Sequence, residues 1–176
     1  MRKVMYLMGV LEDSGIDWLA DNGTTLRLDR GGVLVREGHP IDSLFVVLDG
    51  QLAVDAGGTH VATLLAGEVV GEISFVDSRL PLATVTSLDA ARVLAIRRDL
   101  LQTKLAADPR FAADFYRALA IFLADRLRAT TTRLGYGPPG QDAKAEATDE
   151  LSDDLMETVS LGTRRFDNLL RRVNRL

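Results

Sequence analysis

The sequence predicts a mainly β fold with flanking helices: a β-roll of the jelly-roll type, an N-terminal helix, a long C-terminal helix and an extra C-terminal helical tail. Three observations support this prediction. Residues 1–23 have helical spacing, residues 24–96 consist of short apolar runs separated by turns, and the chain returns to helical spacing after residue 97. The length of 176 residues allows one domain of ordinary size with a tail and excludes two full folds.

The N-terminal segment is expected to form a helix that packs on the domain. Asp13 and Ser14 are its candidate capping residues, and an Asn-Gly pair ends it. The apolar run of residues 4–11 is short and is interrupted at once by Glu12, which argues against a secretory signal. No other stretch approaches the roughly twenty apolar residues of a membrane span, so the expected location is the cytoplasm.

Residues 24–96 carry the pattern of an antiparallel sandwich or barrel. Glycine, aspartate and proline separate the apolar runs at intervals of about 8–12 residues, which is typical of such folds. The expected strands lie in residues 26–28, 33–35, 44–48, 52–54, 61–65, 83–85 and 93–96. Residues 71–77 interrupt the pattern with a short segment of a different kind.

A short helix is expected from about Arg97, and Asp108 followed by Pro109 marks the start of a longer one that ends near Leu134. Its apolar residues form two adjoining stripes, which together cover a wider arc than one contact face. The stripes are Phe111, Phe115, Leu119 and Phe122, and then Tyr116, Ala120, Leu123, Leu127, Thr130 and Leu134. The long helix is therefore expected to contact the β-roll and a second helix, which belongs either to another subunit or to the tail of this chain.

The chain divides into a domain at residues 1–135, a linker rich in glycine, proline and acidic residues at 136–150, and an amphipathic helix at 151–176. Apolar residues in this last helix recur at steps of four and three, as in a heptad repeat. They are Leu155, Val159, Gly162, Phe166, Leu169, Val173 and Leu176. Acidic residues precede the arginines along this segment, which favours antiparallel pairing with a second copy, and docking on its own domain fits the same pattern.

The composition excludes several classes of function. A net charge of −4 argues against binding nucleic acid or a membrane through bulk charge. Cysteine is absent and histidine occurs twice, so neither a metal site nor a cofactor is expected. The sequence contains no Walker-type loop, zinc-protease helix or serine-hydrolase elbow, and we therefore assign no catalytic residue and expect a protein that is not an enzyme.

Residues 67–75 are the segment with recognisable chemistry. A glycine followed by a turn of helix exposes backbone N–H groups, which together with the helix dipole favour an anion such as phosphate. The carboxylate of Glu72 can accept a hydrogen bond from a sugar hydroxyl. Taken alone, the same pattern also fits a bulge or a turn between strands.

Four runs of sequence, residues 32–38, 42–50, 67–75 and 83–85, occur in an order and at a spacing that resemble the cyclic nucleotide-binding domain of catabolite-activator-type regulators, kinase regulatory subunits and nucleotide-gated channels. The resemblance covers residues from about 15 to 134. It implies a β-roll that binds cyclic AMP or cyclic GMP, and a long helix that closes over the ligand or forms a dimer seam. It also implies a set of ligand-binding residues: Gly71, Glu72 on the ribose 2′-hydroxyl, Ile73 and Ser74 at the phosphate, and Ala83 and Thr84 near the phosphate and base.

Pro81 departs from the pattern of this family. The family's phosphate-binding arginine lies two residues before the alanine that Ala83 matches, and proline supplies neither a charge nor an N–H. Arg79 is the candidate substitute, with a solvated loop arginine as the alternative. Loss of a buried charge-assisted hydrogen bond costs about 1.5–3 kcal/mol, which corresponds to about ten- to a hundredfold in affinity.

Two hypotheses about function follow. The first is a regulatory sensor that binds cyclic AMP or cyclic GMP and signals through its C-terminal helices, as a homodimer, to a protein partner. The second is a degenerate domain that no longer binds nucleotide and serves as a dimerisation or docking module. The segment after residue 134 offers one helix rather than the two of a helix-turn-helix, so direct DNA binding is not expected.

Overall fold

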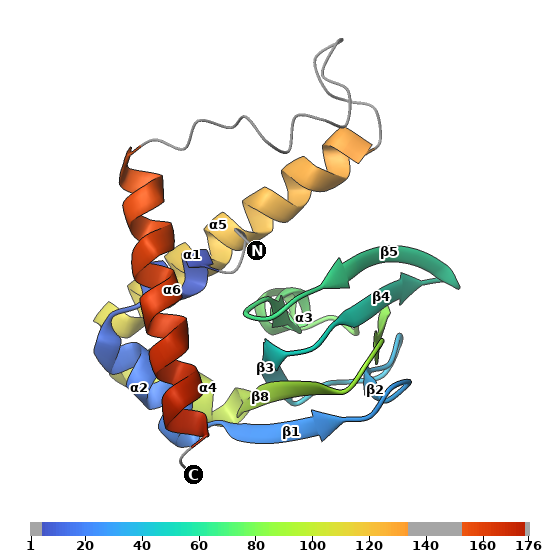
Figure 1. Cartoon of the computed structure of the whole chain (residues 1–176), viewed down its shortest axis with the longest axis horizontal. Coiled ribbons are helices and arrows are strands. Elements are labelled where there is room, and N and C mark those ends of the chain that lie inside the picture. The colour runs from blue at the N-terminus through green and yellow to red at the C-terminus, as the bar shows by residue number, and fades with distance from the viewer. Residues whose placement is uncertain (1–4, 134–152, 175–176) are drawn as a thin grey trace.

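The computed structural model describes residues 5–133 and 153–174. Within them, eight strands form a roll of two antiparallel sheets, and helices cover one side of it (Figure 1). This architecture confirms the predicted fold class. None of the helices in the described ranges combines the length and the apolar content needed to cross a lipid bilayer.

Each sheet has four strands. The first sheet has the order β1-β8-β3-β6 and the second the order β2-β7-β4-β5. Their bounds are β1 Thr24–Leu28, β2 Val33–Val35, β3 Ser43–Asp49, β4 Leu52–Ala56, β5 Thr59–Leu64, β6 Val69–Val70, β7 Thr84–Ser87 and β8 Ala91–Arg97. Neighbours in each order pair antiparallel, for example Leu44 with Ile96. All seven predicted strand runs overlap these strands.

Strand β3 explains why the molecule has two cores. Side chains alternate between the two faces of a strand, so a strand that is apolar at every position is buried on both sides. Leu44, Val46 and Leu48 face the helices, whereas Phe45 and Val47 face the second sheet. The first sheet is therefore a shared wall between the helical layer and the interior of the roll.

Two helices, rather than the one predicted, precede the roll. They are α1 (Met5–Val10) and α2 (Asp13–Asn22). The N-cap of α2 is Glu12, so the predicted capping residues Asp13 and Ser14 lie in the first turn of the helix instead. Glu12 forms an ion pair with Arg110, which ties this start to the long helix that follows the roll.

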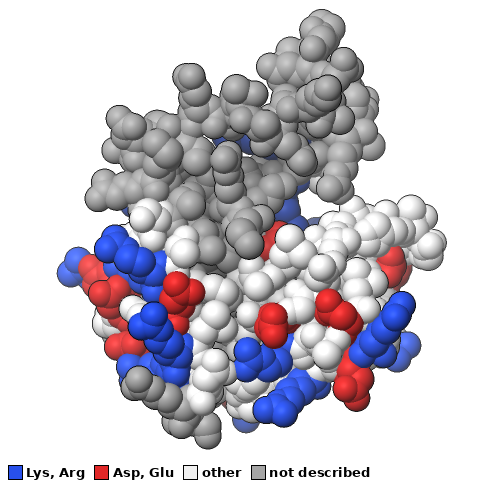
Figure 2. All heavy atoms as spheres, viewed as in Figure 1, with Lys and Arg blue, Asp and Glu red and all other residues white. Residues whose placement is uncertain are grey.

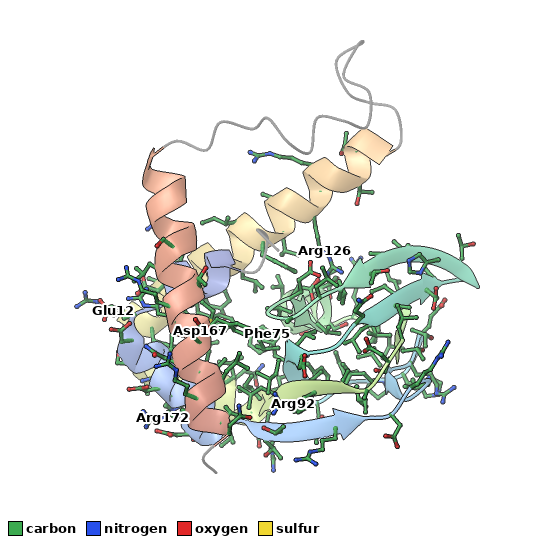
Figure 3. The ribbon with its side chains drawn as sticks, viewed as in Figure 1. Glu12, Phe75, Arg92, Arg126, Asp167 and Arg172 are labelled. Atoms are coloured by element: carbon green, nitrogen blue, oxygen red, sulfur yellow. The ribbon has the colours of Figure 1, made fainter. Side chains whose placement is uncertain are left out.

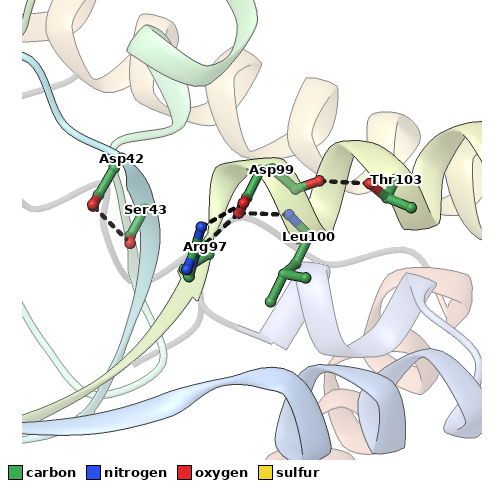
Figure 4. Close-up of polar contacts among 6 residues, drawn as sticks. All are labelled: Asp42, Ser43, Arg97, Asp99, Leu100 and Thr103. Carbon is green, nitrogen blue, oxygen red and sulfur yellow. Dashed lines mark hydrogen bonds and ion pairs between the residues drawn. The ribbon is translucent and has the colours of Figure 1, made fainter.

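Two helices follow the roll, α4 (Arg98–Ala107) and α5 (Pro109–Arg133). Arg97 donates from Nε to Asp99 Oδ1 over 3.0 Å at the start of α4 (Figure 4). Asp108 caps α5 as predicted, since its Oδ1 accepts the Phe111 N–H over 3.0 Å. The ammonium of Lys104, 2.8 Å from the other carboxylate oxygen, and this N–H lower the pKa of Asp108.

The two stripes of α5 differ in burial. The first is buried in the helical core, with Phe115 fully covered. On the second, Tyr116 is 50% and Leu127 is 67% exposed, so the described part of the chain leaves part of that face uncovered. Leu134, the last predicted member, lies outside the described residues.

The tail helix α6 (Asp153–Val173) docks on the domain. Phe166 and Leu169 are buried in the same core as α1, α2 and α5. Two arginines of the predicted basic segment anchor it. Arg165 donates to the Gly9 carbonyl over 3.0 Å and pairs with Asp13. Arg172, which Figure 3 labels on α6, pairs with Asp17 and Asp21.

Docking thus accounts for two arginines of the tail, Arg165 and Arg172. Figure 2 shows basic and acidic side chains interspersed on the side of the molecule where α2 and α6 lie. Of the two arrangements that the sequence allowed, the structure contains the docked helix, and pairing with a second copy stays a prediction. The predicted linker at 136–150 and the side chains of Leu155, Val159 and Leu176 lie outside the described residues.

Candidate functional site

A cavity of about 110 Å³ lies inside the roll, and we call it the roll cavity. The second sheet supplies one wall, through residues such as Val35, Val54 and Val85. The short helix α3 (Glu72–Asp77) and the loop after it supply the other side, and α5 contributes one side chain, Arg126. The roll cavity therefore touches both the strands and the long C-terminal helix.

Gly71 sets the approach of α3 to the cavity. Its φ of +91° is left-handed, which glycine adopts without strain. A Cβ at this position would lie 2.8 Å from Ile41 Cδ1 and 3.1 Å from the Ser43 carbonyl oxygen. Both conformation and space therefore require glycine here, and the residue that follows, Glu72, is placed at the cavity wall.

Glu72 is the most buried charged residue of the site. It is 2% exposed, and its Oε1 accepts a hydrogen bond from Nη1 of Arg126. The guanidinium comes from α5 and also lies over the Phe122 ring, 5.3 Å from its centroid, so it stands between α5 and α3 (Figure 3). The carboxylate that the resemblance assigns to a ribose hydroxyl is thus bound to the long helix.

Burial raises the pKa of Glu72, and the attraction of Arg126 offsets only part of that rise. A carboxylate removed from water loses hydration that a single guanidinium restores incompletely. Glu72 consequently takes up a proton more readily in the folded chain than in the unfolded one. Its ionised form depends on Arg126 staying in place.

Two further contacts hold α3 against the helical layer. Arg98, from the start of α4, donates to the Ser74 carbonyl over 2.9 Å and to the Phe75 carbonyl over 3.2 Å. These are carbonyls near the C-terminal end of α3, where a cation is favoured. Phe75 packs edge-on against Phe115 of α5, with 5.8 Å between the ring centroids. Movement of α3 would therefore change contacts with both α4 and α5.

Five of the seven predicted site residues line the roll cavity. They are Gly71, Glu72, Ile73, Ser74 and Ala83. Thr84 is not among the lining residues, because its hydroxyl accepts the Glu37 N–H over 3.1 Å in the neighbouring loop.

Arg79 does not face the cavity either. Its side chain is 85% exposed, and its Nε lies 3.8 Å from Asp77. This conformation corresponds to the alternative of a solvated loop arginine. A role for Arg79 at a phosphate stays a prediction, and it requires the loop to rearrange. Pro81, by contrast, lines the cavity at the position of the family's arginine, and its carbonyl accepts the Gly38 N–H over 2.9 Å.

Arg126 is a site residue that the sequence analysis does not identify. The apolar stripes of the long helix do not include it, although it lies one turn after Phe122. Its position four residues beyond a buried stripe residue was the available signal, because side chains at this spacing share a face of a helix.

We predict that replacing Arg126 with methionine, which keeps an apolar stem, lowers the free energy of unfolding by about 3–5 kcal/mol at pH 7. The reason is that Glu72 loses its partner while it remains buried. Because the pKa of Glu72 is raised above its ordinary value of 4.5 in the folded chain, the free energy of unfolding falls as pH rises above 4.5. This fall is larger without Arg126, which otherwise stabilises the ionised carboxylate. Below pH 4.5 the two proteins should differ little, because Glu72 is protonated in both.

Urea denaturation at a series of pH values measures this. The matched control is Arg117→Met, an exposed arginine on the same helix, which should stay within about 0.5 kcal/mol of wild type. An effect of Arg126→Met that is equal at all pH values would show that the loss comes from packing and not from the ion pair.

Comparisons with known proteins agree with this fold. Residues 25–108 match the model of the cyclic nucleotide-binding domain. A CRP-like cAMP-activated global transcriptional regulator of Mycobacterium tuberculosis is 26% identical over 129 residues, which are 70% of this chain and 56% of the relative. A cGMP-dependent protein kinase of Caenorhabditis briggsae is 31% identical over 77 residues, which are 44% of this chain and 10% of the kinase. The chain thus spans about half the length of the first relative.

Solved structures show the same fold. The N-terminal domain of a transcriptional regulator from Streptomyces coelicolor is 29% identical, with a TM-score of 0.59 over 72% of this chain and 91% of that one. A cyclic nucleotide-binding domain from Methylobacillus flagellatus is 21% identical, with a TM-score of 0.68 over 79% of this chain and 84% of that one. The match and the fold together place residues 25–108 in the cyclic nucleotide-binding domain family.

Proposed function

We propose that this chain is a non-catalytic ligand sensor in which a small molecule in the roll cavity acts on α5 through Glu72 and Arg126. One observation carries the proposal: the buried carboxylate at the cavity wall is bonded to a side chain of the long helix. A ligand that donates a hydrogen bond to Glu72 competes with Arg126 for the carboxylate or shares it with Arg126. Occupancy of the cavity is thereby linked to the position of α5.

The linkage needs only modest energies. A ligand shifts a conformational equilibrium by its difference in affinity for the two states, and coupling between sites is typically about 1–3 kcal/mol. A charge-assisted hydrogen bond is worth about 1.5–3 kcal/mol, which is the same range. Making or breaking contacts of Glu72 is therefore sufficient to bias α5.

Family membership makes cyclic AMP and cyclic GMP the first ligands to test. In that pose Glu72 accepts the ribose hydroxyl, Gly71, Ile73 and Ser74 surround the phosphate, and Ala83 and Thr84 lie nearby. Arg79 would have to replace the missing arginine. The relatives named above as activated by cyclic AMP or dependent on cyclic GMP support this pose, and Pro81 weighs against the phosphate contact.

The signal would leave through the helical layer. Phe115 of α5, Leu11 beside α1 and Phe166 of α6 belong to one buried core, so a shift of α5 reaches the docked tail. Displacement or tightening of α6 then presents a changed surface to a protein partner. We propose no DNA contact for the described part of the chain, since the arginines Arg165 and Arg172 are engaged in docking.

The exposed stripe of α5 favours a second candidate, an assembly module that keeps the fold and needs no ligand. Tyr116 and Leu127 lie on one face with Leu123 and Ala120, at the steps of three and four residues that pair helices. A second copy of the chain would cover this face. Dimerisation is compatible with sensing, so the two candidates differ in whether a ligand is required.

The sensor is tested by thermal unfolding with a panel of cyclic nucleotides and neutral ring compounds. A compound at 100 times its dissociation constant adds about 2.7 kcal/mol of stability, which raises the Tm of a chain of this size by about 5–10 °C. Glu72→Gln should reduce that shift, because the carboxylate is lost, and Glu68→Gln, beside the cavity but not lining it, should not. If no compound moves the Tm of wild type, the sensor proposal fails.

The assembly module is tested by light scattering on Leu127→Glu. A charge within the stripe should convert a dimer into a monomer, because it would be buried without a partner. Arg117→Glu, at an exposed position about 100° round the helix from Tyr116 and about 80° from Leu127, should leave the mass unchanged. A monomeric wild type would contradict pairing through α5.

A further inference from the structure

The walls of the roll cavity are mostly apolar. Aliphatic side chains make up most of the lining on the strand side, among them Val35, Val54 and Leu64. Ser74 and the backbone at the start of α3 add uncharged polar groups. Among the described residues that line the cavity, Glu72 and Arg126 are the charged ones, and they are bonded to each other. While both are ionised, this described part of the lining has no net charge, and Arg126, its one cation, is already engaged.

A phosphodiester would enter this cavity without a counter-charge of its own. Pro81 occupies the wall where the family's arginine would stand, and Arg79 points to Asp77 outside it. Burying an ionised group without a partner is strongly unfavourable, and Glu72 is a carboxylate in the same cavity, which repels a second anion. An anion could gain a cation only by taking Arg126 from Glu72, which would leave that carboxylate buried and alone.

The volume of the cavity favours a small guest. At about 110 Å³ it is somewhat smaller than an apolar cavity of about 150 Å³ that holds one benzene molecule. A single ring or a short aliphatic chain is therefore the size of molecule that this volume accommodates.

The rim of the cavity is apolar as well. Leu82 is 77% exposed, Leu80 is 52% exposed and Ile73 is 49% exposed, and all three border the opening. Apolar side chains that line an opening and remain exposed are typical of sites that an apolar ligand covers.

Building on the sensor function proposed above, we infer that the roll cavity selects a neutral, mostly apolar ligand of about one ring, with a hydroxyl or N–H group that donates to Glu72, in place of a phosphodiester. The apolar body fills the space between the strands and the rim leucines. The single donor satisfies the carboxylate that α5 holds through Arg126. This assigns a ligand class that differs from the cyclic nucleotides of the matching family.

The test compares three probes on the full 176-residue chain by calorimetry and amide NMR shifts. Cyclohexanol is neutral and carries one donor, cyclohexanecarboxylate has the same ring with a negative charge, and cyclic AMP is the larger phosphodiester. Cyclohexanol should bind at least tenfold more tightly than the other two. The amide signals that move should include those of Gly71, Ile73 and Ala83.

Variants separate cavity binding from surface binding. Ala83→Phe fills the cavity and should abolish cyclohexanol binding, whereas Ala106→Phe, at an exposed position of α4, should leave it unchanged. Pro81→Arg restores a cation at the wall and should improve binding of the carboxylate tenfold or more.

Three results would overturn the inference. Cyclic AMP or the carboxylate binding wild type as tightly as cyclohexanol would refute the ligand class and leave the sensor function standing. A second contrary result is an anion that binds with uptake of a proton, where the proton uptake is lost in Glu72→Gln. This would show that the anion binds Arg126 while Glu72 is protonated. Binding of none of these probes, together with no Tm shift across the wider panel, would remove both the ligand class and the sensor function.

Discussion

The arrangement of this protein depends on one buried ion pair, between Glu72 at the wall of the roll and Arg126 on the long helix. Buried pairs contribute little net stability compared with apolar side chains of similar size, but breaking one is costly. The ionised form of Glu72 has lost most of its hydration, and this loss raises the pKa of the carboxyl group. The pair is therefore better suited to linking two elements than to stabilising either, and it joins the wall of the roll cavity to the long helix α5.

Other contacts of the site hold Glu72 and Arg126 close to each other. Gly71 lets α3 approach the strands closely, Arg98 binds the carbonyls near the end of α3, and Phe75 packs against Phe115 of α5. The roll cavity thus has one wall of strands that pair with their neighbours and one wall that is fastened to helices. In the proposed function, a ligand that alters the second wall would act on α4 and α5 together, and through the shared core on the docked tail.

Local signals were sufficient for most of the fold. Apolar runs separated by turn residues predicted the strands, and Asp108 before Pro109 predicted the start of α5, because these signals are local in the sequence. Arg126 is harder to predict, since its spacing from Phe122 indicates only the face of α5 on which it lies, and its partner is 54 residues away. The position of Arg79 depends on a loop conformation that Ser78 and Asp77 determine. Docking of α6 was undecided, because a heptad pattern suits a partner helix in the same chain or in another.

The central claim, that the cavity and α5 are coupled through this pair, is tested most directly by a double-mutant cycle. Glu72→Gln, Arg126→Met and the double variant are compared with wild type by urea denaturation at pH 7. If the pair links the two elements, the two effects are not additive, and the coupling energy approaches the loss of about 3–5 kcal/mol expected for Arg126→Met alone. Effects that add to within about 0.5 kcal/mol would show that Glu72 and Arg126 act independently, and would contradict the account.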